Sequence, residues 1–326
     1  MSPISARHDP ELEPDAIRAA LDRIHPAFTG APQFVHEGLS LRAGVPVVVK
    51  VESVNPIRSF KGRGTWLAVR EMAGEGRIGP DRAVVAASTG NFGQGLAFAG
   101  RSLGIPVVVF ADEHANPGKL ARMRAFGATV IQSGRDFDAA RAESEAYVRA
   151  NDAVLLVDGE EPWVATGAGT LAVELTDGVA ANSLPPLATA HIPVGNGALI
   201  VGMGAWLRAA SPHTRIVGVQ SEAAPSMTES WLQGIPVSTE TAATFAEGMA
   251  TRVPVPEALD MMVGRVDEMQ LVSEAALREA QAELTEAIGI LVEGAGAASW
   301  AALLEDPGRS AGAVLVLITG SNVPPR

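Results

Sequence analysis

A lysine beside glycines is the residue of this sequence best suited to covalent chemistry. Lys61 lies in the segment Ser59–Gly64, which reads Ser-Phe-Lys-Gly-Arg-Gly and stands between a predicted strand and a predicted helix. A lysine amine that is withdrawn from water becomes a nucleophile and condenses with carbonyl groups. A lysine taken at random is most often a solvated surface charge, but glycines let backbone and ligand approach closely. The segment therefore predicts a reactive amine at Lys61.

A second segment, Ser88–Gly95, is suited to binding an anion. It reads Ser-Thr-Gly-Asn-Phe-Gly-Gln-Gly, leaves a predicted strand and opens a predicted helix. Free backbone N–H groups and two hydroxyls at a helix N-terminus attract an anion such as a carboxylate. An ordinary N-cap by Ser88 or Thr89 is the simpler interpretation, but it leaves the glycines around Asn91 unexplained.

Two further turns follow predicted strands. The turn Gly195–Leu199 opens a helix, and its glycines would let successive amides surround a phosphate, although a tight turn without a ligand is nearly as good an interpretation. It lacks the Lys-Ser/Thr pair of a Walker A loop and the downstream acid of a dinucleotide site. The turn Thr319–Asn322 places a hydroxyl where it could meet a heterocyclic nitrogen, or it is simply a C-terminal turn.

These segments depend on a framework of alternating strands and helices. The predicted strands are Val45–Val51, Ala83–Ala87, Pro106–Phe110, Thr129–Gln132, Val154–Val157, His191–Val194, Arg215–Val219 and Ala313–Ile318. The predicted helices are Gly64–Ala73, Phe92–Leu103, Asp136–Ala150, Trp163–Asp177, Leu199–Ala210, Glu274–Ile288 and Ala295–Leu304. Nearly continuous Val, Ile and Leu strands separated by helices indicate a doubly wound α/β class with parallel strands. Ligands bind beyond the carboxyl ends of such strands, so we expect three of the turns to share one crevice.

The composition excludes several classes of function. The chain has 326 residues and a formal net charge of −12, which disfavours nucleic acid and anionic membranes as partners. It contains no cysteine, so disulfides, thiolate catalysis and Cys-ligated metal sites are excluded. The N-terminus lacks a secretory pattern, and no apolar run approaches the roughly 20 residues of a membrane helix. We expect a soluble, cytoplasmic protein.

Together and in this order, the segments resemble the fold-type II enzymes that depend on pyridoxal 5′-phosphate (PLP), and within them the serine/threonine dehydratase and serine racemase branch. The family patterns Lys-x-Glu-(Asn/Ser) and Ser-Phe-Lys-x-Arg-Gly match Lys50–Ser53 and Ser59–Gly64, and Ser-x-Gly-Asn-His-x-Gln-Gly matches Ser88–Gly95. Looser matches are Thr244–Ala250 and Glu293–Ala297. The resemblance implies two doubly wound α/β domains of the tryptophan synthase β-like type.

The resemblance also implies roles for individual residues. Lys61 would form the Schiff base with PLP and move the Cα proton, and Thr89 would be a second catalytic residue. Phe60 would pack beside the pyridine ring, Asn91 would hydrogen-bond the 3′-oxygen, and the turn after residue 194 would surround the phosphate. The implied cofactor residues are Phe60, Lys61, Asn91, Gly195, Asn196, Gly197, Ala198, Leu199, Glu293 and Thr319. The implied substrate residues are Ser88, Thr89, Gly90, Asn91 and Phe92.

The position of Thr319 favours one reaction. The resemblance places its hydroxyl against the pyridine nitrogen, and a hydroxyl does not hold that nitrogen protonated. The cofactor is then a weaker electron sink, which favours β-elimination over transamination. The predicted function is therefore a lyase that converts L-threonine or L-serine to a 2-oxo acid and ammonia. Alternatives are a threonine synthase-like or β-replacement enzyme, an amino-acid racemase, a dinucleotide-binding oxidoreductase built on the Gly195 turn, and a PLP-binding protein without activity.

Several residues depart from the family pattern. Phe92 replaces a histidine, and Ile57 and Arg58 replace a common Thr-Gly pair. Arg58 is either a solvated charge or a residue that selects a substrate with a second anionic group. Gln220 and Ser226 stand where several members carry acids that bind a divalent cation, so we expect no metal there.

The resemblance further implies a division of the chain and an assembly. Residues 1–76 and 151–326 would form a large PLP-binding domain, and residues 77–150 a small inserted α/β domain that carries Asn91. The substrate would bind between them, and closure of the small domain would exclude water. A homodimer is expected, with a small amino acid as the ligand partner.

Overall fold

A six-stranded sheet forms the larger half of the protein. In the computed structural model, which describes residues 3–306 and 311–323, its strand order is β1-β2-β10-β7-β8-β9. Neighbouring strands are parallel except β1 with β2. The strands are β1 (Gln33–Val35), β2 (Val47–Val51), β7 (Leu187–Pro193), β8 (Arg215–Ser221), β9 (Glu268–Val272) and β10 (Ala313–Ile318).

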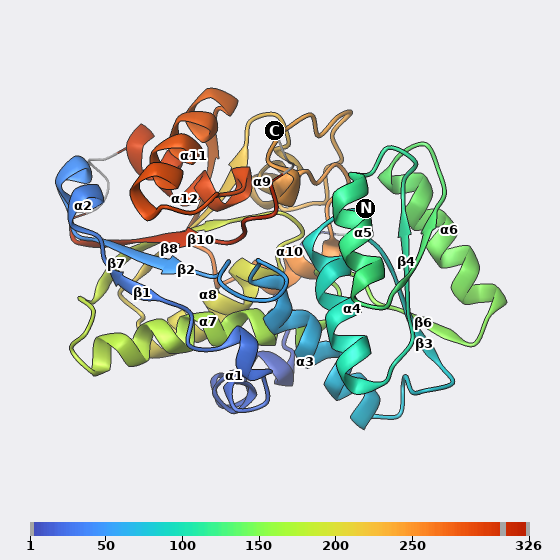
Figure 1. The fold of residues 1–326 in the computed structure, drawn as a ribbon. Coiled ribbons are helices and arrows are strands. Elements are labelled where there is room, and N and C mark those ends of the chain that lie inside the picture. The colour runs from blue at the N-terminus through green and yellow to red at the C-terminus, as the bar shows by residue number, and fades with distance from the viewer. Residues whose placement is uncertain (1–2, 307–310, 324–326) are drawn as a thin grey trace.

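Helices cover both faces of this sheet (Figure 1). On one face lie α11 (Glu274–Ile288) and α12 (Gly294–Glu305), and on the other α1 (Pro14–Leu21), α7 (Pro162–Ala180) and α8 (Ala198–Ala210). Every residue of β2 and β10 is buried, which is why these strands are nearly unbroken apolar runs. The shorter helices of this half are α2 (Glu37–Ala43), α9 (Ser226–Gln233) and α10 (Pro256–Met262).

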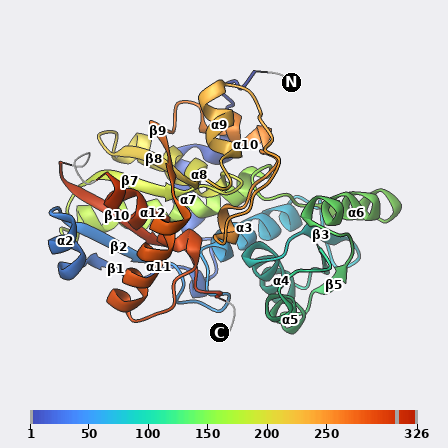
Figure 2. The same cartoon turned by 90° about the horizontal axis from the view of Figure 1, so that it is seen from above.

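A smaller sheet has four parallel strands in the order β5-β4-β3-β6. These strands are β3 (Ala83–Ala87), β4 (Val107–Ala111), β5 (Thr129–Gln132) and β6 (Ala153–Leu155). Helices α4 (Asn91–Leu103) and α5 (Pro117–Ala125) lie on one face of it and α6 (Phe137–Ala150) on the other (Figures 1 and 2). Helix α3 (Lys61–Gly74) joins the two halves because it packs against both α4 and α7.

Glycines bring α3 into close contact with helices of both halves. A Cβ on Gly64 of α3 would lie 2.4 Å from the carbonyl oxygen of Val164 in α7. A Cβ on Gly95 of α4 would lie 2.4 Å from Oγ1 of Thr65 in α3. Any side chain at either glycine would collide with its neighbour, so these positions fix how closely the helices approach.

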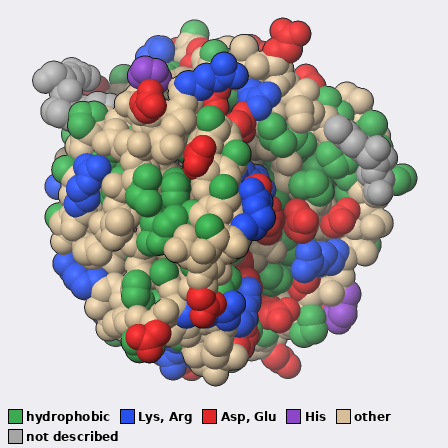
Figure 3. All heavy atoms as spheres, turned by 90° about the vertical axis from the view of Figure 1, so that its right-hand side faces the viewer, with side chains coloured by type: hydrophobic (Ala, Val, Ile, Leu, Met, Phe, Trp, Pro, Cys, Tyr) green, Lys and Arg blue, Asp and Glu red, His purple; other side chains and the backbone are tan. Residues whose placement is uncertain are grey.

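Ion pairs add electrostatic contacts between the halves. Asp138 of α6 pairs with Arg252, and Lys119 of α5 pairs with Glu247. Arg252 and Glu247 both lie in the segment between α9 and α10 of the larger half. Figure 3, which faces the side that carries α6, shows acidic and basic side chains next to one another rather than one sign gathered.

The predicted α/β class with parallel sheets is confirmed. The predicted strand Ala83–Ala87 and the predicted helix Glu274–Ile288 have the same bounds as β3 and α11. The sequence analysis missed β1, which is only three residues long, and β9, which mixes polar and apolar residues at the sheet edge. Among the described residues, no helix is long and apolar enough to cross a membrane.

The division into two domains stays a prediction. The smaller sheet ends with β6, which pairs with β3 and lies just after the predicted boundary at residue 150. We therefore place the end of the small unit a few residues later, because a strand belongs with the sheet to which it is hydrogen-bonded.

A buried network of charges joins β2, α3 and α7. Arg63 has no exposed surface, and its guanidinium donates to both carboxylate oxygens of Glu52 at 2.8 and 2.9 Å. It also donates to both oxygens of Glu174 at 3.0 and 2.8 Å, and to Oγ1 of Thr170 at 3.1 Å. Lys50 pairs with Glu174 at 2.7 Å. Two cations therefore face two anions, and all five donors of the guanidinium are used.

Replacing Arg63 by methionine should lower the free energy of unfolding by about 3–5 kcal/mol, since it leaves Glu52 and Glu174 with an uncompensated buried charge. Urea denaturation of both proteins under the same conditions measures this difference. The matched control is Arg70→Met on the same helix, where the side chain is exposed and the change should stay within about 0.5 kcal/mol. Equal losses in the two variants would contradict the assignment of this network.

Candidate active site

Lys61 is the first residue of α3, and its amine lies between a carboxylate and two aromatic rings. Its Nζ donates to Oδ2 of Asp158 at 2.5 Å. The same atom lies 4.9 Å from the centre of the Phe60 ring and 5.9 Å from that of Phe92. The Lys61 side chain is 18% exposed, so the amine is shielded from most water yet reachable.

The sequence contains three lysines, all of them in the described part of the chain. Lys50 is fully buried in the network around Arg63, and Lys119 pairs with Glu247. Lys61 is therefore the lysine whose amine lies beside the rings of Phe60 and Phe92 in the predicted site segments.

Four glycines near Lys61 and Asn91 lie in close packing contacts, whereas a Cβ on Gly90 would meet no atom within 4 Å. A Cβ on Gly62 would lie 2.3 Å from the Phe28 ring, and one on Gly93 would lie 2.9 Å from Cε of Met123. Gly64 and Gly95 are in similarly close contacts. The sequence analysis explained these glycines by the approach of a ligand, whereas the structure gives close side-chain and backbone contacts as their physical reason.

The loop before α4 begins with a hydroxyl that accepts hydrogen bonds from the backbone. Oγ of Ser88 accepts hydrogen bonds from the backbone N–H groups of Gly90 and Gly93, at 3.2 and 3.0 Å. Ser88 therefore bonds the first turn of α4 from the preceding loop, but the N-cap residue is Gly90 and not Ser88 or Thr89. Thr89 and Gly90 follow it and are half-buried, and Asn91 is the first residue of the helix.

The side chain of Asn91 belongs to a network of hydrogen bonds that joins the two halves. Its Nδ2 donates to both carboxyl oxygens of Glu293, at 2.9 and 3.2 Å. Its Oδ1 accepts from Nδ2 of Asn322 at 2.7 Å, and the backbone N–H of Asn322 donates to Glu293 at 2.8 Å. A Cβ on Gly320 would lie 2.2 Å from Oε2 of Glu293, so a side chain there would displace the Glu293 carboxyl.

The turn Gly195–Leu199 connects β7 to α8 as predicted. Gly197 has a φ of 97°, in the left-handed region, and precedes the first residue of α8. A Cβ on Gly195 would lie 2.3 Å from the carbonyl oxygen of Gly248. No described side chain caps the first turn of α8, where Ala198 and Leu199 are buried, so backbone amides at a helix N-terminus are available to an anion.

Thr319 follows β10 directly and is buried. Its carbonyl oxygen accepts from the backbone N–H of Phe60 at 3.0 Å, and Ser59 and Gly320 form an isolated β-bridge. The C-terminal turn therefore lies against the segment that carries Lys61.

The structure thus brings segments far apart in the chain to one place. The Lys61 segment contacts the turn after β10, that turn contacts Asn91 through Glu293, and Lys61 itself contacts Asp158. Gly159 packs on Asn196, where a Cβ on the glycine would lie 2.5 Å from the asparagine carbonyl oxygen. The ends of β3, β7 and β10, where the sequence predicts a shared crevice, are thus linked to one another and to the end of β6.

The family of the chain follows from a comparison with known proteins. Residues 24–320 match the model of the family described as pyridoxal-phosphate dependent enzyme. The chain belongs to this family. It is therefore a PLP-dependent protein, and the predicted cofactor is confirmed.

Two curated relatives of this PLP family are L-threonine ammonia-lyases. The protein from Geobacter sulfurreducens is 33% identical over 308 residues, which cover 94% of this chain and 75% of the relative. The protein from Thermotoga maritima is 32% identical and covers 87% of this chain and 69% of the relative. These relatives confirm the predicted class, a PLP-dependent lyase.

Solved structures of the PLP family have the same fold. A T.th. threonine deaminase has a TM-score of 0.88 at 29% identity, over 96% of this chain and 99% of that one. The processed threonine deaminase isoform 2 from Solanum lycopersicum has a TM-score of 0.86 at 26% identity, over 99% and 90%. Maize serine racemase, at 24% identity and a TM-score of 0.88, agrees in fold.

Two residues of this candidate site were not among the predicted site residues. Asp158 lies just beyond β6, and an acid followed by glycine at the end of a parallel strand was the available signal. Asn322 lay inside a noted turn, but nothing in the sequence indicates that its side chain reaches Asn91. Both depend on contacts between segments that are far apart in the chain.

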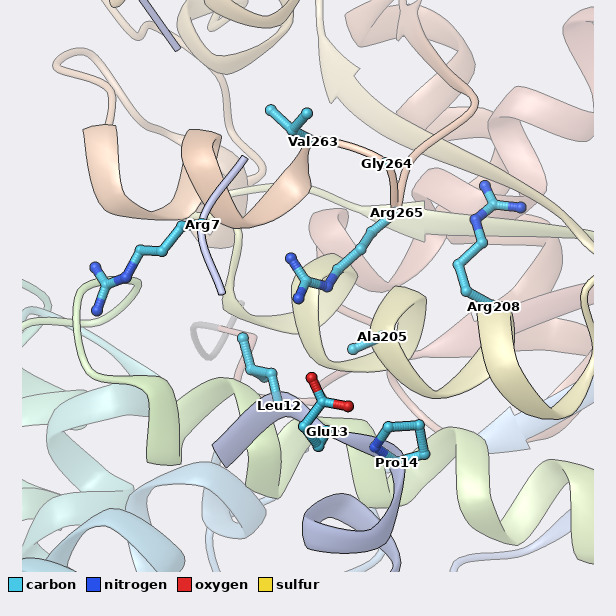
Figure 4. Close-up of a pocket in the computed structure, with 9 residues that line it drawn as sticks. All are labelled: Arg7, Leu12, Glu13, Pro14, Ala205, Arg208, Val263, Gly264 and Arg265. Atoms are coloured by element: carbon cyan, nitrogen blue, oxygen red, sulfur yellow. The ribbon is translucent and has the colours of Figure 1, made fainter. Parts of the chain in front are cut away.

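A cavity of about 290 Å³ lies elsewhere on the PLP-dependent chain (Figure 4). Its lining includes Arg7, Arg208 and Arg265, and it contacts α8 only near the C-terminal end of that helix. Arg7 pairs with Asp9 at 2.8 Å and Arg208 with Asp267 at 2.6 Å, so their charges are matched within the protein. This cavity contains none of the site residues described above.

Burial raises the pKa of Glu293 in this candidate site, and the carboxylate of Glu247 adds to that effect. Lys119, Asn91 and the backbone of Asn322 oppose it, but burial is the largest cause. A carboxyl whose folded-state pKa is raised stabilises the fold fully below pH 4.5, the ordinary value for a glutamate, and this contribution is lost as the pH rises through the folded-state pKa.

The stability of the wild type relative to Glu293→Gln should therefore fall as the pH rises from 4.5 and then level off. Urea midpoints of both proteins from pH 4.5 up to neutral pH measure this difference. Glu286→Gln, at an exposed position of α11, is the control and should show no such trend. Parallel pH profiles for the wild type and Glu293→Gln would refute the raised pKa.

Proposed function

We propose that this chain catalyses β-elimination of a small β-hydroxy amino acid, L-threonine or L-serine, to a 2-oxo acid and ammonia. The observation that carries the proposal is the position of Lys61. Its amine is shielded, contacts Asp158, and lies at the junction of the segments that carry Asn91 and Thr319. The relatives named L-threonine ammonia-lyase support the choice of reaction.

The residues present fit PLP. Lys61 offers an amine to the aldehyde, and the rings of Phe60 and Phe92 beside that amine suit an aromatic cofactor. The uncapped N-terminus of α8 and the left-handed Gly197 suit a phosphate. In our proposal Asn91 and Glu293 hold the polar edge of the ring, and Thr319 meets its nitrogen.

PLP supplies an electron sink for the bond electrons at Cα when it is bound. The protein's own groups do the rest. The N–H groups of the loop after Ser88 hold the substrate carboxylate, with Thr89 at its side. Phe92 and Phe60 exclude water, and the Lys61 amine takes the Cα proton. The carboxylate of Asp158 then stabilises the ammonium that Lys61 becomes.

The atoms balance without a further reactant. The Cα–H and Cβ–O bonds break, and Lys61 passes the Cα proton on to the departing hydroxyl, which leaves as water. The released enamine gains a proton at its β-carbon and is hydrolysed by one water. L-threonine therefore gives 2-oxobutyrate and ammonia, and L-serine gives pyruvate and ammonia. A homodimer and a cytoplasmic location belong to the proposal as family expectations.

Borohydride treatment of the PLP-saturated protein should attach the cofactor to Lys61 and to neither Lys50 nor Lys119, because Lys50 is buried in the Arg63 network and Lys119 is held by Glu247. Mass mapping of the peptides measures this, with the other two lysines as internal controls. Lys61→Ala should lose the absorption near ~410–420 nm. An adduct on another lysine, or on none, would disprove the proposed role.

L-threonine should yield 2-oxobutyrate with the wild type, and Lys61→Ala should be slower by roughly 10³-fold or more, because it loses both the covalent link and the proton acceptor. A coupled assay for 2-oxo acids measures the rate. Formation of a D-amino acid without a 2-oxo acid would contradict elimination and show that the reaction is racemisation.

A further inference from the structure

Two arginines from different halves lie at one edge of the site. Arg122 of α5 donates from Nη1 to Oδ1 of Asn322 at 2.6 Å. Nδ2 of Asn322 donates to Oδ1 of Asn91 at 2.7 Å and to the carbonyl oxygen of Ile57 at 2.8 Å, next to Arg58. Asn322 therefore lies between the Arg122 guanidinium, the Arg58 segment and Asn91.

The backbone of Arg58 is in a conformation that favours glycine. Its φ is 54°, in the left-handed region, where a side chain costs free energy. Hydrogen bonds hold it there, because its N–H donates to the carbonyl oxygen of Asn55 and its own carbonyl accepts from Ser321, both at 3.0 Å. Such strain at the edge of a site points to a function for the side chain.

The charges of the two arginines are not balanced by neighbouring acids. Within the described ranges, neither guanidinium lies in an ion pair, whereas Lys61 and Lys119 each pair with a carboxylate. Burial lowers the pKa of Arg122, the nearby positive charge of Arg58 lowers it further, and the carboxyl of Glu293 opposes both effects. The nearest carboxyl in this network is that of Glu293, whose burial opposes its ionisation.

We propose that Arg58 and Arg122 bind a second carboxylate on the substrate, so that the preferred substrates are β-hydroxy amino acids with an acidic group beyond the β-carbon. Guanidinium groups match carboxylates in geometry and charge. This inference rests on the proposed function, and it extends that function from threonine to its acidic counterpart.

L-threo-3-hydroxyaspartate is the matched probe because it carries a carboxylate where L-threonine carries a methyl group. The same bonds break, at Cα–H and Cβ–O. Lys61 takes the Cα proton and passes it to the departing hydroxyl, which leaves as water, and the released enamine is protonated at Cβ and hydrolysed by one water. The products are oxaloacetate and ammonia, and no oxidant or reductant is needed.

The experiment compares kcat/KM for the two substrates in the holoenzyme and its variants. The wild type should prefer the acidic substrate. Arg58→Gly and Arg122→Ala should each reduce that preference by about 10- to 100-fold, mainly through KM, as expected for losing a hydrogen bond to a charged group. Glycine adopts the φ of residue 58 freely, so Arg58→Gly keeps the fold. The control Arg124→Ala, at an exposed position of α5, should keep the preference.

A binding measurement separates this inference from the proposed function. Calorimetry on the holoenzyme should find that succinate binds more tightly than butyrate, and that Arg58→Gly and Arg122→Ala remove the difference. If succinate binds in this way while no amino acid is turned over, the proposed reaction fails and the subsite stands. If both variants slow the two substrates equally, or succinate and butyrate bind alike, the subsite is refuted.

Discussion

The fully buried guanidinium of Arg63 fixes the position of the Lys61 amine. Arg63 follows Lys61 by two residues, and its five donors are all engaged by Glu52, Glu174 and Thr170. These partners belong to α7 and to the residue that follows β2, so the first turn of α3 cannot rotate without breaking buried charge-assisted hydrogen bonds. The Lys61 amine is therefore positioned by a buried network that takes no part in the proposed reaction.

The site has an uneven distribution of charge. In the interior, cations and anions are matched one against another, as in the pairs of Lys61 with Asp158 and of Lys50 with Glu174. At the edge near Asn322, Arg122 donates to an amide oxygen rather than to a carboxylate, although the chain as a whole carries a formal charge of −12. The long-range field of the protein repels anions, so recognition of an acidic substrate must come from local contacts at short range.

Much of the fold could be predicted from the sequence, because buried parallel strands require nearly continuous apolar runs. β3 and β10 follow that rule, whereas β9 mixes polar residues with apolar ones at a sheet edge and was missed. The site segments could be predicted because their motifs are local. Asp158 could not, because its importance lies in a contact across 97 residues of chain. The packing role of Gly62 could not be predicted either, because its contact Phe28 belongs to no recognised motif.

The glycine contacts of α3 divide the protein into positions that tolerate change and positions that do not. Gly64 and Gly95 lie against backbone or side-chain atoms of neighbouring helices with no space for a methyl group. Arg58 stands outside that packed region, on an exposed loop. Residues around Arg58 can therefore be exchanged, in evolution or by protein engineering, to alter which substrates bind. The packed helices that position the Lys61 amine do not tolerate such exchanges.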